Sequence, residues 1–351
     1  MRPTIDDIAR EVNVSTATVS RALRGLSNVA PETRQKILDR ARELGYQLSP
    51  VATRTARGKK SVGIITPLKP QWFLSKLISS IESYLFAEGL EGHRFSIDSI
   101  DTRTDLIEQL VTTQLVDGLI LTSTSLKAES IDRLAEIGSL KIVTIEGSTE
   151  YFSSVYIDNV EGAKIATSHL INLGHRSIGL ISGEEYDPLY SPIPSQRKEG
   201  YVSALEEASI PVRKELITSG NFSYQGGEKA MEKLFTIKDP PTAIFALSDE
   251  MAIGAMYAIR KMKLRVPEDI SVMGFDDNDV SKYIGLTSVH QPVSEFGEQA
   301  AKQLVYELYH DIEELKHIEL GFNLIIRETT GPGPGRKSNV AGNDFSNDIY
   351  L

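Results

Sequence analysis

The sequence predicts a multidomain chain, in which a small all-α head precedes a larger α/β body of two doubly wound subdomains. Two patterns lead to this prediction. Residues 1–47 contain three stretches with apolar residues at helical spacing, whereas residues 61–332 contain β-branched strands that alternate with helical stretches. With 351 residues, of which 40% are hydrophobic and 25% charged, the chain has a globular composition and is too long for one ordinary core.

The first helix is expected to begin after Thr4. The Thr4 hydroxyl can cap this helix, and Asp7, three residues on, completes a capping-box-like pair. Apolar residues then recur at helical spacing and form one stripe, which consists of Ile5, Ile8, Ala9 and Val12.

The second helix is expected after a turn at Asn13-Val14, with Ser15 as its cap. Small side chains at a helix start let the backbone approach DNA base edges, where a hydroxyl can donate or accept and a methyl can touch thymine. Arginines further along suit phosphates or guanine. Taken alone, this helix start is equally well interpreted as simple capping. The expected inward residues are Val19, Ala22 and Leu23, and the outward residues are Thr16, Ala17, Ser20, Arg21 and Arg24.

A third helix favours DNA binding over simple capping. Pro31 suits its first position, Thr33 and Arg34 lie in its first turn, and the helix is expected to end at Gly45. Three such helices form a compact helix-turn-helix unit. Its inward stripe is expected to contain Ile37, Leu38, Ala41 and Leu44.

Charge is divided unevenly along the chain. Residues 1–60 contain 12 Lys and Arg against 6 Asp and Glu, a net charge of +6, and the remainder contains 26 against 42, a net charge of −16, which together give −10. Positive charge drives phosphate binding through counterion release, and an acidic body does not cancel it beyond a Debye length of about 8 to 10 Å. Only the head is expected to touch nucleic acid.

Several classes of protein are excluded by what the sequence lacks. The chain has no cysteine, which excludes disulfides, thiol catalysis and cysteine-ligated metal sites and fits a reducing cytoplasm. Its six histidines show no metal-ligand spacing, so neither a metal nor a cofactor is expected. Met1 runs almost directly into the first helix without a signal peptide, and no apolar run approaches the ~20 residues that span a bilayer. We expect a soluble cytoplasmic protein that makes no membrane contact and joins the nucleoid when bound to DNA.

The body follows a linker at residues 48–60, which mixes a proline, small residues and four cations. Strands that alternate with helices predict parallel sheets covered on both faces, and ligands in such folds bind at the carboxyl ends of the strands. Strands are expected at 61–66, 93–98, 117–122 and 141–146, with helices at 72–88, from about 104 and near 126. A second series has strands at 155–158, 177–182, 216–220, 242–247 and 270–275, with helices near 160–173, 196–208, 225–235 and 249–261.

Polar and aromatic residues collect where these strands end, and they predict a small-ligand pocket. Carboxylates and a guanidinium can hold the hydroxyls of a polyol or sugar, and an aromatic face can stack on its CH surface. Each residue also has a structural interpretation, since an aspartate after a strand, such as Asp249, is often a helix cap. The candidates are Trp72, Phe73, Thr122, Glu146, Arg197, Phe222, Ser248, Asp249 and Asp276.

The chain resembles the lactose-repressor (LacI) family of transcription regulators along nearly its whole length. The matching segments are residues 4–23, 29–34, 44–46, 117–119, 173–176, 248–254, 265–267, 274–277, 290–292 and 327–329. The resemblance implies a homodimer whose heads read an operator, a hinge helix that folds on DNA, and a body like sugar-binding periplasmic proteins. By matched position, Ser15, Thr16, Ala17 and Arg21 would contact DNA, and Arg197, Phe222 and Asp276 would hold the effector. The full set expected at DNA adds Thr4, Ser20, Arg24, Asn28, Thr33, Arg34, Val51, Arg54 and Thr55.

The resemblance also implies that the chain crosses between subdomains near residues 159–163, 289–292 and 320–323. The N-terminal subdomain would then contain residues 61–160 and 291–322, and the C-terminal one residues 161–290 and 323–332. The remaining residues, 333–351, are rich in Gly, Asn and Ser and are expected to be a disordered tail.

Three positions depart from the family pattern. Thr55 stands where the hinge usually has a leucine that wedges into the minor groove, and a shorter hydroxyl-bearing side chain gains less from unstacking bases. Ser248 and Arg24 each stand where asparagine is frequent, which leaves the ligand and the operator sequence open.

The function expected from these observations is a sequence-specific repressor controlled by a small ligand. An activator or a co-repressor-dependent regulator of the same fold is the alternative. A periplasmic solute-binding protein would need an export signal and has no use for a basic head. An enzyme is not expected, because Asp276 and Asp277 are adjacent on an extended segment and point to opposite sides, and the Gly58-Lys59 segment lacks the earlier glycine of a phosphate loop.

Overall fold

The computed structural model describes residues 4–23, 29–44, 46, 60–69, 71–99, 102–103, 106, 109–110, 115–123, 134, 140–147, 151–184, 192–312 and 314–334. Five residues expected at DNA lie outside this range, namely Arg24, Asn28, Val51, Arg54 and Thr55. The helix expected near residue 126, and the tail beyond residue 334, also lie outside it.

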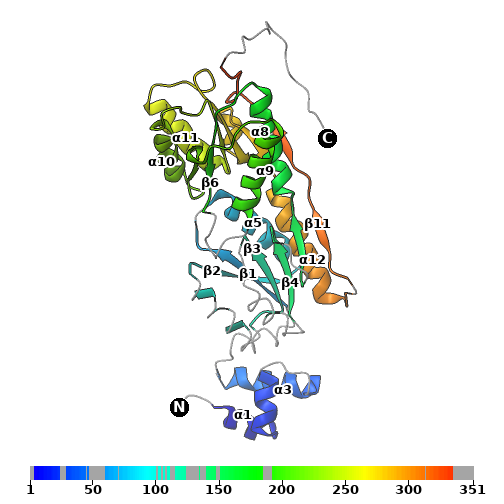
Figure 1. The fold of residues 1–351 in the computed structure, drawn as a ribbon. Coiled ribbons are helices and arrows are strands. Elements are labelled where there is room, and N and C mark those ends of the chain that lie inside the picture. The colour runs from blue at the N-terminus through cyan, green and yellow to red at the C-terminus, as the bar shows by residue number, and fades with distance from the viewer. Residues whose placement is uncertain are drawn as a thin grey trace.

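The head contains the three expected helices, α1 (Ile5–Val12), α2 (Thr16–Leu23) and α3 (Pro31–Glu43) (Figure 1). The capping box of α1 is confirmed, because the Thr4 side chain accepts from the Asp7 backbone and the Asp7 side chain accepts from the Thr4 backbone. All three helices contribute to one small core, which contains Ile8, Ala9, Val19, Ala22, Leu23, Val29, Ile37, Leu38 and Ala41. The apolar stripes expected from the sequence therefore meet, and this burial holds the unit together.

The first sheet of the body has the strand order β11-β5-β4-β3-β1-β2, and every pairing in it is parallel. Helices α5 (Trp72–Ala87) and α12 (Val293–Tyr309) contact each other, and α12 packs on β3, β4 and β5. We call this unit the N-subdomain. Its strands are β1 (Ser61–Pro67), β2 (Glu91–Ile97), β3 (Gly118–Thr122), β4 (Lys141–Ile145), β5 (Ser153–Tyr156) and β11 (His317–Glu319).

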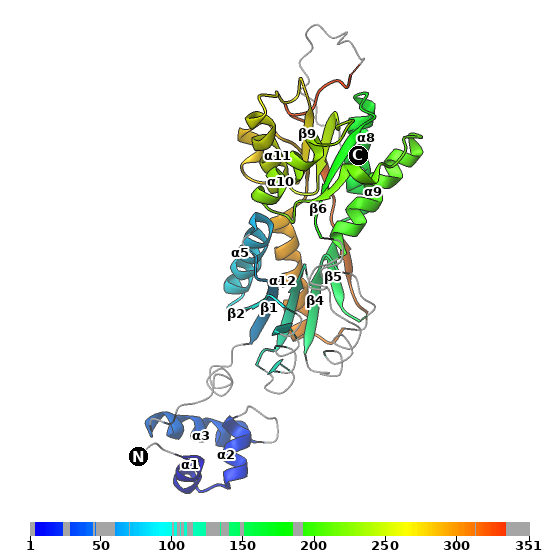
Figure 2. The same ribbon diagram turned by 60° about the vertical axis from the view of Figure 1, so that its left-hand side comes forward.

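The second sheet has the order β12-β10-β9-β8-β6-β7 and is parallel except for β12. The pair α8 (Asn159–Asn172) and α9 (Ile193–Glu207) and the pair α10 (Tyr224–Phe235) and α11 (Asp249–Lys261) lie on opposite sides of it (Figure 2). We call this unit the C-subdomain. Its strands are β6 (Ile178–Ser182), β7 (Ile217–Ser219), β8 (Ala243–Ala246), β9 (Ser271–Asp276), β10 (Thr287–His290) and β12 (Asn323–Ile325), and two short 3-10 helices lie at Lys214–Leu216 and Ser281–Tyr283.

The chain passes between the subdomains at residues 157–158, 291–292 and 320–322. The expectation of a crossing at residues 159–163 is wrong, because α8 begins at Asn159. The Asp158 side chain accepts a hydrogen bond from the Glu161 backbone N–H at 2.8 Å, and this cap starts the helix directly after the crossing.

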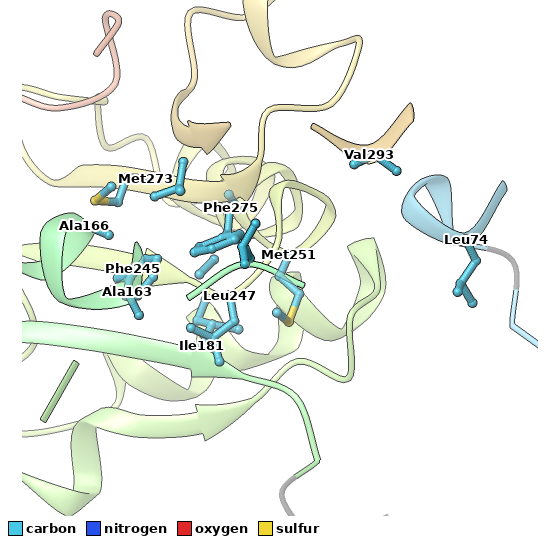
Figure 3. Close-up of a cluster of buried hydrophobic side chains, with 14 of the residues drawn as sticks. Leu74, Ala163, Ala166, Ile181, Phe245, Leu247, Met251, Met273, Phe275 and Val293 are labelled. Carbon is cyan, nitrogen blue, oxygen red and sulfur yellow. The ribbon is translucent and has the colours of Figure 1, made fainter. Parts of the chain in front are cut away.

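The core of the C-subdomain lies between its sheet and the helices on either side. Strand β8 is buried along its whole length, as a strand of a covered parallel sheet should be. Figure 3 shows Phe245, Met251 and Phe275 packed near one another, with Leu74 and Val293 of the N-subdomain further away. Within the described part of the chain, no helix combines the length and the apolar character needed to cross a membrane.

Candidate functional site

The start of α2 presents the best candidate surface for nucleic acid in the head. Ser15 caps this helix by accepting a hydrogen bond from the Thr18 backbone N–H at 3.1 Å, and Thr16, Ala17 and Arg21 are exposed. The first turn of α2 contains no acidic residue, whereas the first turns of α1 and α3 do. The positive end of the α2 dipole and its free backbone N–H groups are therefore available to an anion such as phosphate.

The other described residues of the expected DNA set are half-buried or, like the exposed Thr4, already hydrogen-bonded within the head. The Thr4 hydroxyl donates to Asp7 Oδ2 at 2.7 Å, which ties it to the cap of α1. Ser20 is half-buried on α2, and Thr33 and Arg34 are half-buried at the start of α3.

A pocket with a cavity volume of about 60 Å³ lies between the two subdomains. Residues from both subdomains line it. Six of the residues expected at the ligand line the pocket, namely Phe73, Glu146, Arg197, Phe222, Ser248 and Asp276. The lining also includes Gln71, Ser123, Ile193, Pro194, Glu250 and Gln291.

Arg197 is held rigidly in the pocket wall. It lies on α9 and is buried, with Nε donating to Asn159 Oδ1 at 2.8 Å and Nη1 donating to the Leu247 carbonyl at 2.7 Å. Its guanidinium carbon lies 3.6 Å from the centroid of the Phe275 ring. Two hydrogen bonds and an aromatic contact fix the guanidinium plane before any ligand arrives.

Two carboxyl groups, one from each subdomain, approach Arg197. Glu146 Oε1 lies 3.8 Å from Nη2, and Asp276 Oδ1 lies 3.8 Å from Nη1. Burial raises the pKa of Glu146 above its usual value, and burial raises the pKa of Asp276 well above its usual value, while the Arg197 charge opposes both shifts. A raised pKa favours the neutral form of a carboxyl group, and only that form can donate a hydrogen bond as well as accept one.

Gln291, at a crossing between the subdomains, is the third polar group of this cluster. Its Nε2 donates to Asp276 Oδ1 at 2.6 Å. Among the described residues, no group donates to Gln291 Oε1 or to Glu146 Oε1, and both oxygens are buried. A buried acceptor without a donor is costly, so these two atoms favour a ligand that brings hydroxyl or amine donors.

Backbone strain is concentrated around the pocket. Four lining residues at or just after strand ends have positive φ, namely Ser123 (43°), Glu146 (60°), Phe222 (50°) and Asp276 (116°). This region of φ is unfavourable for residues other than glycine and is found where surrounding structure forces it, often at binding sites.

Two residues expected at the ligand do not line the pocket, for identifiable reasons. Thr122 ends β3, is buried and donates to the Ile65 carbonyl at 3.2 Å. Trp72 lies at the edge of the cleft, where its Nε1 donates to Asp279 Oδ2 of the C-subdomain at 3.0 Å. The first supports the sheet, and the second joins the two subdomains.

Asp249 also lies outside the pocket lining, and it anchors the loop after β9. Its Oδ2 accepts from the Asn278 backbone N–H at 2.7 Å and from Ser281 Oγ at 2.6 Å, and its Oδ1 accepts from Ser288 Oγ at 2.5 Å. Gly274 makes this approach possible, because a Cβ there would lie 2.1 Å from Asp249 Oδ1.

Glu250 and Gln291 are the informative residues that the sequence analysis missed. Glu250 follows Asp249 directly, so the sequence predicts only that it lies at the start of a helix and not that it lines the pocket. Gln291 lies in the His290-Gln291-Pro292 segment. Its side chain reaches the pocket only because the chain crosses between the subdomains there.

Comparisons with known proteins agree with both halves of this description. A family model described as bacterial regulatory proteins of the lacI family matches residues 4–49, and a periplasmic binding protein-like domain matches residues 167–330. The chain is 31% identical to the HTH-type transcriptional repressor PurR of Mannheimia succiniciproducens, over 93% of this chain and 98% of that protein.

Two solved structures resemble the whole chain. The transcriptional regulator CelR in complex with cellobiose has a TM-score of 0.69 and 29% identity, over 93% of this chain and 100% of that one. The lac repressor dimer bound to operator and the anti-inducer ONPF has a TM-score of 0.70 and 26% identity, over 94% of this chain and 100% of that one. The chain therefore belongs to the lacI family of bacterial regulatory proteins and is a DNA-binding transcription regulator with a ligand-binding body.

Proposed function

We propose that this regulator is a homodimeric repressor whose affinity for its operator is controlled by a sugar or related polyol bound between the subdomains. The composition of the pocket carries the proposal, since carboxyl groups from both subdomains meet one guanidinium beside aromatic rings. A ligand there touches both subdomains at once, so it binds one relative placement of them more tightly than others. That preference is the means by which it changes operator affinity.

The effector site is assigned to Phe73, Glu146, Arg197, Phe222, Ser248 and Asp276. The Oε1 atoms of Glu146 and Gln291, which accept no hydrogen bond from the described residues, would accept hydrogen bonds from ligand hydroxyls. The rings of Phe73 and Phe222 supply apolar surface for the CH face of a sugar. The cellobiose bound to the relative CelR, itself a polyhydroxylated sugar, supports the same ligand class.

Operator contact is assigned to Ser15, Thr16, Ala17 and Arg21 at the exposed start of α2, where base edges and phosphates can be approached closely. Thr4, Ser20, Thr33 and Arg34 are assigned to flanking contacts. A homodimer would present two such heads to the two halves of a palindromic operator. The lac repressor relative, a dimer on its operator, supports this arrangement.

The proposal is tested in two steps with the full-length protein. A thermal-shift screen against neutral sugars, sugar phosphates and nucleobases finds the ligand, because binding to the folded state alone raises the melting temperature. Operator retardation is then measured with and without that ligand for wild type, Arg197→Ala, Asp276→Ala and the surface control Glu82→Gln.

We expect both pocket variants to bind operator as wild type does while losing the ligand effect, and the control to keep it. If both variants respond at the wild-type ligand concentration, the pocket assignment is wrong. A purely structural ion pair would instead lower the melting temperature of the variants and leave the ligand response intact.

A further inference from the structure

The charge of the pocket lining is strongly one-sided. Among its described residues it contains three carboxyl groups, on Glu146, Glu250 and Asp276, and Arg197 is its only cation. The lining therefore has three acidic groups for one basic group. Carboxylates facing a bound anion at short range disfavour it strongly.

Arg197 is not free to compensate an incoming anion. Its Nε and Nη1 already donate to Asn159 and to the Leu247 carbonyl, and its charge is shared between Glu146 and Asp276. A phosphate or carboxylate group that needs two parallel N–H donors would have to displace one of these contacts.

The two lysines near the cleft edge are also occupied. Lys76 Nζ lies 3.5 Å from Asp279 Oδ1, and Lys69 Nζ donates to Asn221 Oδ1 at 3.2 Å. Neither lysine lines the pocket. Lys76 is therefore paired with a carboxylate, and neither ammonium group belongs to the pocket lining itself.

Glu250 is the carboxyl group best placed to act on an entering ligand. It lies in the first turn of α11, lines the pocket and contacts the Tyr224 hydroxyl and the backbone N–H of Trp72, across the cleft. Burial, assisted by the nearby Asp249 charge, raises the pKa of Glu250 to about 7. Within the described part of the chain, the guanidinium of Arg197 pairs with Glu146 and Asp276, so Glu250 is the carboxyl group of the three whose charge Arg197 does not offset.

We propose that Glu250 makes the pocket reject anionic ligands, so that the effector is an uncharged or cationic polyol and its phosphorylated or carboxylated counterparts are excluded. This inference rests on the proposed function, since it takes the pocket as the effector site. It goes further by naming the residue that sets the charge of the accepted ligand.

The first test needs no effector, because Trp72 is the only tryptophan of the chain and contacts Glu250 through its backbone. Quenching of its fluorescence by iodide is compared with quenching by neutral acrylamide for wild type, Glu250→Gln and Glu82→Gln at pH 8. We expect Glu250→Gln to raise the iodide-to-acrylamide ratio about twofold, whereas Glu82→Gln, which changes an exposed charge on α5, leaves it unchanged. An unchanged ratio in Glu250→Gln would overturn the proposal.

The second test measures ligand choice directly. Wild type and Glu250→Gln are screened by thermal shift against matched pairs: glucose with glucose 6-phosphate, ribose with ribose 5-phosphate, and glucosamine with glucosamine 6-phosphate. We expect the wild type to bind the phosphate-free member at least ~10-fold more tightly and the variant to narrow that gap. A phosphorylated member that binds the wild type more tightly than its parent would refute the role of Glu250. If no sugar of any charge binds while the iodide result holds, the proposed ligand class fails and the charge selectivity stands.

Discussion

Removing the Asp249 carboxylate should destabilise the body far more than removing a typical surface group. The carboxylate is buried and accepts three hydrogen bonds, from Asn278, Ser281 and Ser288, that join α11 to the loop after β9 and to β10. A hydrogen bond to a charged group contributes about 1.5 to 3 kcal/mol, and the three share one acceptor group and do not add fully. We expect Asp249→Ala to lower the free energy of unfolding by about 4 kcal/mol, and Asp249→Asn, which keeps the shape and one acceptor, by about 2 kcal/mol.

The assay is urea unfolding of the full-length protein, followed by the fluorescence of Trp72 and by far-UV circular dichroism. Ser281→Ala, which removes one of the three donors and leaves the carboxylate in place, is the matched control and should cost about 1 kcal/mol. A loss below ~1 kcal/mol for Asp249→Ala would refute the reasoning, because the buried network would then contribute no more than one ordinary hydrogen bond.

The same residue predicts a pH dependence. Burial outweighs the three hydrogen bonds and raises the pKa of Asp249 to about 6, above the ~3.9 expected in the unfolded chain. Because the folded state holds this proton more tightly, the contribution of Asp249 to stability is greatest below about pH 4 and falls as the pH rises to about 6. Asp249→Asn should lack this part of the pH profile, and an identical profile in variant and wild type would contradict the assignment.

Three further predictions concern other parts of the chain. A fragment that begins at Ser61 should bind no duplex DNA at physiological salt, and full-length binding should weaken steeply with salt, because the net positive charge lies in residues 1–60 and the remainder is net negative; retardation by the fragment equal to that of the whole chain would contradict this. Thr55→Leu should tighten operator binding and increase the DNA bend at one fixed salt concentration, because leucine brings more apolar area to a wedge in the minor groove; an already kinked wild-type complex with unchanged affinity would point to another wedge, such as Val51. Burial lowers the pKa of His169 to about 4, so its contribution to stability is present above about pH 6.5 and is lost as the pH falls towards 4. His169→Gln should therefore make the free energy of unfolding depend less on pH in that interval. An unchanged dependence would show that other groups cause the acid sensitivity.

Local patterns were sufficient to predict most elements of the fold. Helix α11 was expected at 249–261 and spans Asp249–Lys261, because a serine cap follows a buried apolar strand. Helix α8 was expected near 160–173 and spans Asn159–Asn172, but the crossing before it was expected too late in the chain, since the Asp158 cap is a one-residue signal within an irregular stretch. The pairing of β11 with β5 joins residues more than 150 positions apart. Periodicity along the chain predicts that a segment is a strand but not which distant strand it pairs with.

The pocket was only partly predictable for a related reason. Arg197 and Asp276 follow strands or open helices, so the carboxyl-end rule places them at the right edge. Whether a strand-end residue faces the ligand or the protein depends on its backbone angles and its neighbours. Asp249 turns inward because Gly274 leaves room for it, and Glu250 then faces the cleft. Tertiary packing therefore decides the direction in which a strand-end side chain points, and the sequence alone does not predict it.

The way the chain crosses between subdomains has a consequence for its synthesis on the ribosome. The first sheet receives its edge strand β11 at His317–Glu319, and its covering helix α12 at Val293–Tyr309, only after every helix of the C-subdomain has been made. Until then the faces of β3, β4 and β5 on which α12 packs stay uncovered. The nascent chain must hold these apolar strands in a partly finished state while the later unit folds. The unit that is translated first therefore stays incomplete until nearly the whole body has been made, and only strand β12 of the C-subdomain (Asn323–Ile325) follows its last strand.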